Sequence, residues 1–124
     1  MQVYKSKWFN KWACKEGITD SDLSAAVREM VAGLIDAELG GHVIKKRLAP
    51  QGHGKSGGAR TLLAFKLGQA AFFMYGFAKN QQDNISSKEL TALKAMAKYV
   101  LGLTPAQINQ ALGAGEFIEV KHHD

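Results

Sequence analysis

The sequence contains a single cysteine, Cys14, among 124 residues. One thiol excludes an internal disulfide framework and is compatible with a reducing compartment. No uncharged apolar run is long enough to cross a bilayer, since the longest extends only from about Ala70 to Ala78. The N-terminus lacks the apolar segment of a secretion signal, and internal repeats are absent. We therefore expect one soluble cytoplasmic domain that does not bind membranes.

Acidic residues are missing from the whole stretch between Glu38 and Asp83. This stretch, Leu39 to Gln82, is called the basic segment. The rest of the chain holds 9 basic and 11 acidic residues, so the positive charge is segregated. Segregated charge of one sign attracts polyanions, and the basic segment therefore predicts a nucleic-acid partner, above all RNA. The alternative is a solvated loop whose charge faces only water. The basic residues of the segment are Lys45, Lys46, Arg47, Lys55, Arg60, Lys66 and Lys79.

Hydrophobic periodicity predicts an α+β domain with the order β-α-α-β-β-β-α. The clearest helix start is Ser86, followed by Glu89 at the capping-box spacing. Helices that precede and follow an antiparallel meander predict packing of the helices on one face of the sheet. The expected strands are 2–6, 43–48, 60–67 and 70–78. The expected helices are 7–15, a second helix that is capped by Thr19, Asp20 or Ser21 and ends near Gly40, and 86–101. A short helix from Thr104 and an extended segment 117–120 are expected to follow.

Strand alternation assigns the basic residues of the first meander strand to faces. Lys45 and Arg47 share one face, whereas Lys46 falls on the apolar face and reaches solvent only at the sheet edge. Lys45 and Arg47 are therefore preferred to Lys46 as ligands of RNA.

The last two strands add a guanidinium and aromatic rings. Arg60 begins the second strand, where its planar fork can bind a phosphate bidentately. Alternation places Phe73, Tyr75, Phe77 and Lys79 on one face of the third strand, where rings beside a cation can stack bases. Alternating aromatics on a central strand are also typical of a hydrophobic core, and both interpretations stay open.

The loop between the first two strands is rich in glycine. Its spacing excludes a nucleotide-binding phosphate loop, because the required first glycine falls at Ala49. Backbone amides and Lys55 can still approach a phosphate there, and His53, with an ordinary pKa of about 6.5, suits acid–base chemistry. Metal-ligand spacing is absent, so no metal and no cofactor are expected.

Three stretches together carry a resemblance to a known family. The stretch 43–49 reads VIKKRLA, 52–60 reads GHGKSGGAR and 75–80 reads YGFAKN. With the order of the elements, they resemble the RelE/HigB-type toxins of bacterial type II toxin–antitoxin systems. The resemblance covers 1–103 as the toxin domain, and 104–124 then form a helical and extended appendage of the same domain.

This resemblance implies a small fold with a twisted antiparallel sheet and a ribosome-dependent mRNA endonuclease activity. Such enzymes make the ribose 2′-OH attack the adjacent phosphate, which requires no metal. The implied cations are Lys45, Arg47, Lys55, Arg60 and Lys79, with Arg60 stabilising the transition state. Phe77 and Gln81 depart from the family pattern, which has a tyrosine and an acidic residue there. Tyr75 or His53 is the substitute for the missing general base.

The resemblance also implies partners and leaves alternatives. The expected partners are a cognate antitoxin, of the helix-turn-helix DNA-binding kind, and mRNA on the ribosome. A ParE-like inhibitor of DNA gyrase would share the fold, although it has no need of the basic cluster. A catalytically inactive RNA-binding or regulatory protein is the third possibility, suggested by Phe77 and Gln81.

Overall fold

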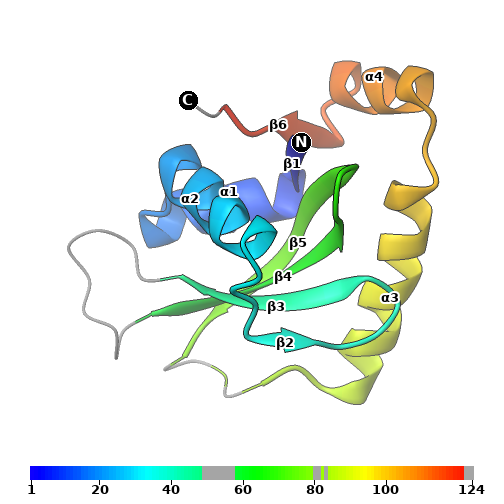
Figure 1. Ribbon diagram of the computed structural model, residues 1–124. Coiled ribbons are helices and arrows are strands. Elements are labelled where there is room, and N and C mark those ends of the chain that lie inside the picture. The colour runs from blue at the N-terminus through cyan, green and yellow to red at the C-terminus, as the bar shows by residue number, and fades with distance from the viewer. Residues whose placement is uncertain (49–57, 80–81, 83, 122–124) are drawn as a thin grey trace.

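The computed structural model describes residues 1–48, 58–79, 82 and 84–121 of the chain. Within these residues the protein is an α+β domain, as predicted, built on a six-stranded sheet (Figure 1). The elements, in order, are β1 (Gln2–Ser6), α1 (Lys7–Glu16), α2 (Asp20–Val31), β2 (Ala37–Glu38), β3 (Val43–Leu48), β4 (Ala59–Lys66), β5 (Ala70–Ala78), α3 (Ser87–Leu101), α4 (Pro105–Gly113) and β6 (Phe117–Glu119).

The strands follow one another across the sheet in the order β2-β3-β4-β5-β1-β6. The antiparallel meander β3-β4-β5 is confirmed, and β4 begins and ends one residue earlier than expected. A tight turn joins β4 to β5, where Gly68 has a φ of 80° and Gln69 N donates to Lys66 O at 3.0 Å. β1 pairs in parallel with β5 and antiparallel with β6, so the segment expected as an appendage joins the sheet.

Helices cover both faces of the sheet, and the prediction of packing on one face is wrong. α1 and α2 bury Phe9, Leu23 and their neighbours on one face, and α3 and α4 bury Leu93, Ala111 and theirs on the other (Figure 1). The reason is visible in β5, where eight of nine residues are buried. A strand that is apolar on both faces needs cover on both.

A β-bulge in β5 changes which aromatic residues share a face. Tyr75 pairs with Leu62 and Phe73 pairs with the next residue, Leu63, so Met74 is the extra residue of the bulge. Alternation is therefore reset, because an extra residue turns the following side chains to the other face. Phe73 packs against Phe9 of α1, with ring centroids 5.2 Å apart, and does not share the face of Tyr75 as predicted.

The predicted helix starts are confirmed by their hydrogen bonds. Ser86 and Glu89 form the capping box of α3, and Thr104 caps α4, with Pro105 as its first residue. Thr19, one of three expected caps, caps α2, which begins directly after it. The expected end of this helix near Gly40 is wrong, because the helix stops at Val31, Gly33 adopts a positive φ of 95°, and the chain then pairs as β2 with β3. None of the described helices combines the length and the apolarity that crossing a bilayer requires.

Candidate functional site

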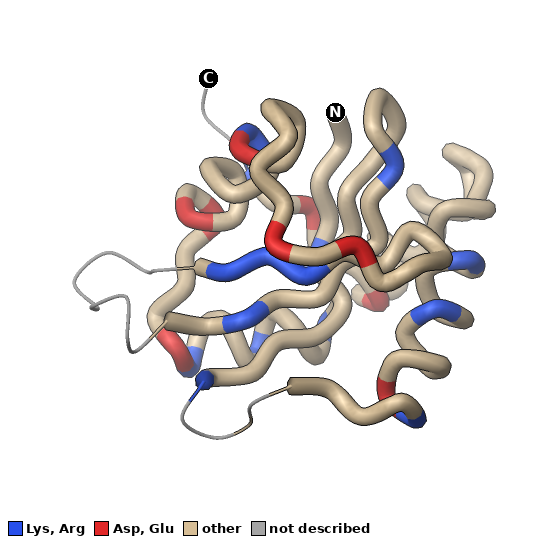
Figure 2. Tube along the Cα trace, turned by 60° about the horizontal axis from the view of Figure 1, so that its bottom comes forward, with Lys and Arg blue, Asp and Glu red and all other residues tan. Residues whose placement is uncertain are grey.

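Four cations lie together on the α3 side of the sheet, near one end of the meander. In the strand register Arg47 is opposite Arg60, and Arg60 is opposite Phe77, two residues before Lys79. In Figure 2 the basic positions of β3, β4 and the end of β5 follow one another across the sheet, and acidic positions lie along the neighbouring β2 segment. We call these four residues the cation row: Lys45, Arg47, Arg60 and Lys79.

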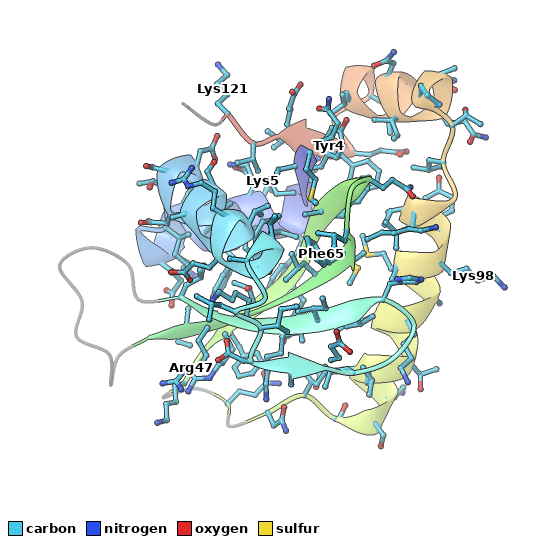
Figure 3. The ribbon with its side chains drawn as sticks, viewed as in Figure 1. Tyr4, Lys5, Arg47, Phe65, Lys98 and Lys121 are labelled. Carbon is cyan, nitrogen blue, oxygen red and sulfur yellow. The ribbon has the colours of Figure 1, made fainter. Side chains whose placement is uncertain are left out.

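Three members of the cation row have side chains accessible to a large anion. Arg47 and Lys79 are exposed, and Lys45 is partly exposed. Figure 3 shows Arg47 at the margin of the sheet, far from Lys98 on α3. Arg60 is half-buried like Lys45, and its register partners are Arg47 on one side and Phe77 on the other. Neither of the two ion pairs between described residues involves the cation row.

Lys46 lies apart from the cation row, on the opposite face, as strand alternation predicted. Only 7% of the residue is exposed, and its Nζ lies 2.8 Å from Glu29 Oε1 of α2. The same Nζ donates to Leu34 O at 3.1 Å. Two acceptors therefore satisfy this ammonium inside the protein, and it does not face the ligand surface.

Tyr75 and Phe77 flank the cation row from β5. Phe77 is almost fully buried, at 3% exposure, so its ring belongs to the hydrophobic core on the α3 side. Tyr75 is only partly buried, and its ring lies 6.3 Å from that of Phe77. Of the two aromatic candidates, Tyr75 alone has surface available to a ligand.

The hydroxyl of Tyr75 points towards the start of α3. It donates to Gln82 Oε1 at 3.4 Å, and Gln82 Nε2 lies 3.4 Å from Glu89 Oε1. Burial, followed by the nearby Glu89 carboxylate, raises the pKa of Tyr75 above its usual value. The hydroxyl is therefore protonated at neutral pH and acts as a hydrogen-bond donor.

Glu89 holds its charge for a structural reason. Its Oε1 accepts from Ser86 N at 2.8 Å, and this capping bond is the main cause that lowers the pKa of Glu89. Sequence reasoning identified Glu89 as a capping residue and missed its place beside Tyr75. Gln82 was missed altogether. No local sequence pattern indicates that Glu89 or Gln82 lies near Tyr75, because this contact depends on how the chain returns from β5 to α3.

Two sequence candidates, Lys55 and His53, fall outside the described residues, as does Gln81. The residues that border the 49–57 segment are Leu48 and Gly58. Gly58 O accepts from Lys79 N at 3.4 Å and Leu48 directly follows Arg47, so both bordering residues lie beside the cation row.

The site thus combines four cations with one phenolic donor on a rigid sheet. Cations on adjacent strands are suited to holding consecutive phosphates of a polyanion, and a guanidinium fixed among them is suited to developing negative charge. A family model described as "RelE toxin of RelE / RelB toxin-antitoxin system" matches residues 1–120 of the chain. No curated protein matches it.

Proposed function

The chain belongs to the RelE toxin family of RelE/RelB toxin–antitoxin systems, and from this premise we propose that it is a ribosome-dependent mRNA endonuclease. The observation that carries the proposal is the cation row, which lies on three adjacent strands and has Tyr75 as a neighbour in the strand register, opposite Leu62 and in line with Lys45. A protein that merely needs a positive charge for solubility has no reason to gather unpaired cations on one face.

The proposed reaction is transfer within the RNA backbone. The 2′-oxygen of a ribose attacks the adjacent phosphorus, and the bond from phosphorus to the 5′-oxygen of the next nucleotide breaks. The products are a 2′,3′-cyclic phosphate and a free 5′-hydroxyl. One proton leaves the 2′-oxygen and one arrives at the 5′-oxygen, so the site needs an acceptor and a donor.

The cation row supplies charge stabilisation. We assign Arg60 to the developing charge on the phosphorane oxygens, because it is half-buried on β4, the central strand of the cation row, between register partners on both sides. Lys79 is assigned to the same phosphate from the end of β5. The partly exposed Lys45 and the exposed Arg47 then bind the flanking phosphates and set the position of the RNA strand.

Proton transfer is assigned to Tyr75 and His53. Tyr75 is the donor to the leaving 5′-oxygen, because burial and Glu89 raise its pKa and keep it protonated. His53 is the acceptor from the 2′-oxygen, since an ordinary histidine is largely neutral at pH 7. Lys55 from the same segment is assigned to phosphate binding.

The partners follow from the family. An antitoxin encoded with the toxin would hold it inactive, and translating ribosomes would present the mRNA in the cytoplasm. We propose an antitoxin of the helix-turn-helix DNA-binding kind.

Primer extension on a message translated in a purified system tests the proposal. We expect new 5′ ends inside the translated region, formed only when ribosomes are present. Intact mRNA together with broken DNA bound to gyrase would instead identify a gyrase inhibitor. RNA binding without new ends would identify an inactive RNA-binding protein.

A further inference from the structure

The solvent face of α1 carries a stripe of lysines next to two tryptophans. Lys7, Lys11 and Lys15 recur every four residues and therefore share one side of the helix. All three are exposed, and neither of the ion pairs between described residues involves them. Trp8 and Trp12 follow the same spacing on the adjacent side, so the two stripes run along the helix together.

Trp8 is unusually open for a tryptophan that has aromatic partners. It is 48% exposed, although its ring stacks on Tyr75 with centroids 4.8 Å apart and planes at 24°. It is also nearly parallel to Trp12, at 10°, with centroids 6.3 Å apart. A tryptophan that served only to cover apolar surface would gain more by burying its ring.

The aromatic stack reaches the cation row without interruption. Trp8 stacks on Tyr75, Tyr75 lies beside Phe77, and Phe77 is the register partner of Arg60. β1 ends at Ser6, so beyond it α1 occupies the open side of β5. The aromatic contacts therefore link α1 to the strand positions of the cation row, and the buried Phe77 forms the inner part of this link.

Alternating cations and an exposed ring are the elements with which proteins bind single-stranded nucleic acid. Lysines follow the phosphates, and an aromatic face stacks with a base of any sequence. We propose that α1 carries a second RNA contact, in which Trp8 stacks on an unpaired base and the lysine stripe binds the phosphates beside it. This rests on the proposed function only for the identity of the polyanion, because the geometry of α1 is independent of the cleavage chemistry.

The test is binding of a short 2′-O-methyl oligouridine, which cannot be cleaved, at low salt. A matched strand with abasic riboses separates stacking from phosphate binding. We expect Trp8→Ala to weaken binding of the oligouridine about tenfold and to leave the abasic strand unaffected. Lys11→Ala should weaken binding of both strands and reduce the salt slope by about 0.7.

Matched controls lie on α3, where Lys98 and Tyr99 are also exposed. Lys98 points away from the sheet in Figure 3. Lys98→Ala and Tyr99→Ala should bind both strands as the wild type does. Equal loss of both strands in Trp8→Ala, or no loss of either, would overturn the proposal.

Fluorescence supplies a second measurement that does not depend on the stability of Trp8→Ala. The oligouridine should quench the wild type strongly and Trp8→Phe weakly, since Trp12 alone remains. Equal quenching of both proteins would also contradict the proposal. Stacking on Trp8 without cleavage on ribosomes would refute the endonuclease and keep the α1 contact. If the protein cleaves mRNA on ribosomes but Trp8→Ala binds RNA as the wild type does, the α1 contact is refuted and the endonuclease proposal is kept.

Discussion

Arg47 and Arg60 are direct cross-strand partners in β3 and β4, so two positive charges share one position on the face of the sheet. Like charges directly opposite each other destabilise a sheet, and neither residue belongs to an ion pair between described residues. A phosphate bound between the two guanidiniums would attract both, and this attraction would replace their mutual repulsion. The pair is therefore understandable as a binding feature that the fold alone does not require.

The first prediction concerns this repulsion. Arg47→Gln should raise the free energy of unfolding by about 0.5 kcal/mol, with the larger gain at low salt, because screening weakens the repulsion. The same variant should cleave mRNA more slowly. Urea unfolding at two salt concentrations measures the stability. Lys66→Gln, an exposed change at the other end of β4, serves as the control and should show neither effect.

The second prediction separates two adjacent lysines. Lys45→Met should weaken RNA binding, because its side chain belongs to the cation row. Lys46→Met should leave binding unchanged, because its ammonium is directed at Glu29 and Leu34 on the other face. Salt-dependent binding of an uncleavable RNA distinguishes the two variants. Equal losses would show that the face assignment is wrong.

The third prediction concerns the phenol of Tyr75. Burial and then the Glu89 carboxylate raise its pKa, so removing the charge with Glu89→Gln should lower it towards the usual value of about 10. Glutamine keeps the capping box of α3, so the fold should persist. A raised pKa favours folding below the unfolded value, and this stabilisation disappears as the pH rises through the folded pKa. Because the proposed proton donor Tyr75 would lose its proton at lower pH in Glu89→Gln, cleavage by this variant should begin to fall at lower pH than cleavage by the wild type.

Ultraviolet titration of tyrosinate gives the direct measurement. Tyr75→Phe identifies the contribution of Tyr75, since the chain contains two further tyrosines, Tyr4 and Tyr99. An identical Tyr75 titration in wild type and Glu89→Gln would contradict the assigned electrostatic contact.

The fourth prediction concerns Gly76, on which α1 packs. A Cβ at this position would lie 2.2 Å from a ring carbon of Trp12, which must then move. Gly76→Ala should destabilise the protein by about 1–3 kcal/mol and weaken RNA binding by displacing the aromatic stack. Gly113→Ala is the control, because nothing lies within 4 Å of the added carbon. Thermal unfolding of both variants measures the difference.

The sequence was most informative where local chemistry decides structure. The caps at Thr19, Ser86 and Thr104 fix helix starts by short-range hydrogen bonds. Ser86 and Thr104 were predicted, and Thr19 was one of three expected candidates. The separation of Lys45 from Lys46 followed from the period of a strand. Both properties depend only on residues that are near in sequence.

Long-range features escaped prediction. The bulge at Met74 moved Phe73 to the α1 face, and alternation has no means of indicating an extra residue. The apolar run of β5 indicates a strand that is buried on both faces. The order of the helices along the chain nevertheless led to the prediction that all helices pack on one face of the sheet. The contact of Trp8 with Tyr75 joins residues far apart in sequence, so no local pattern places Trp8 beside the candidate site.

The central claim is that the cation row cleaves mRNA on the ribosome, and the single-turnover cleavage rate on programmed ribosomes tests it most directly. Wild type, Arg60→Ala and Lys66→Ala are compared, with circular dichroism to verify folding. The claim predicts that Arg60→Ala lowers the rate by about 10²–10³-fold, while Lys66→Ala, changed on the same strand, cleaves at the rate of the wild type. A folded Arg60→Ala that cleaves as fast as Lys66→Ala would contradict it.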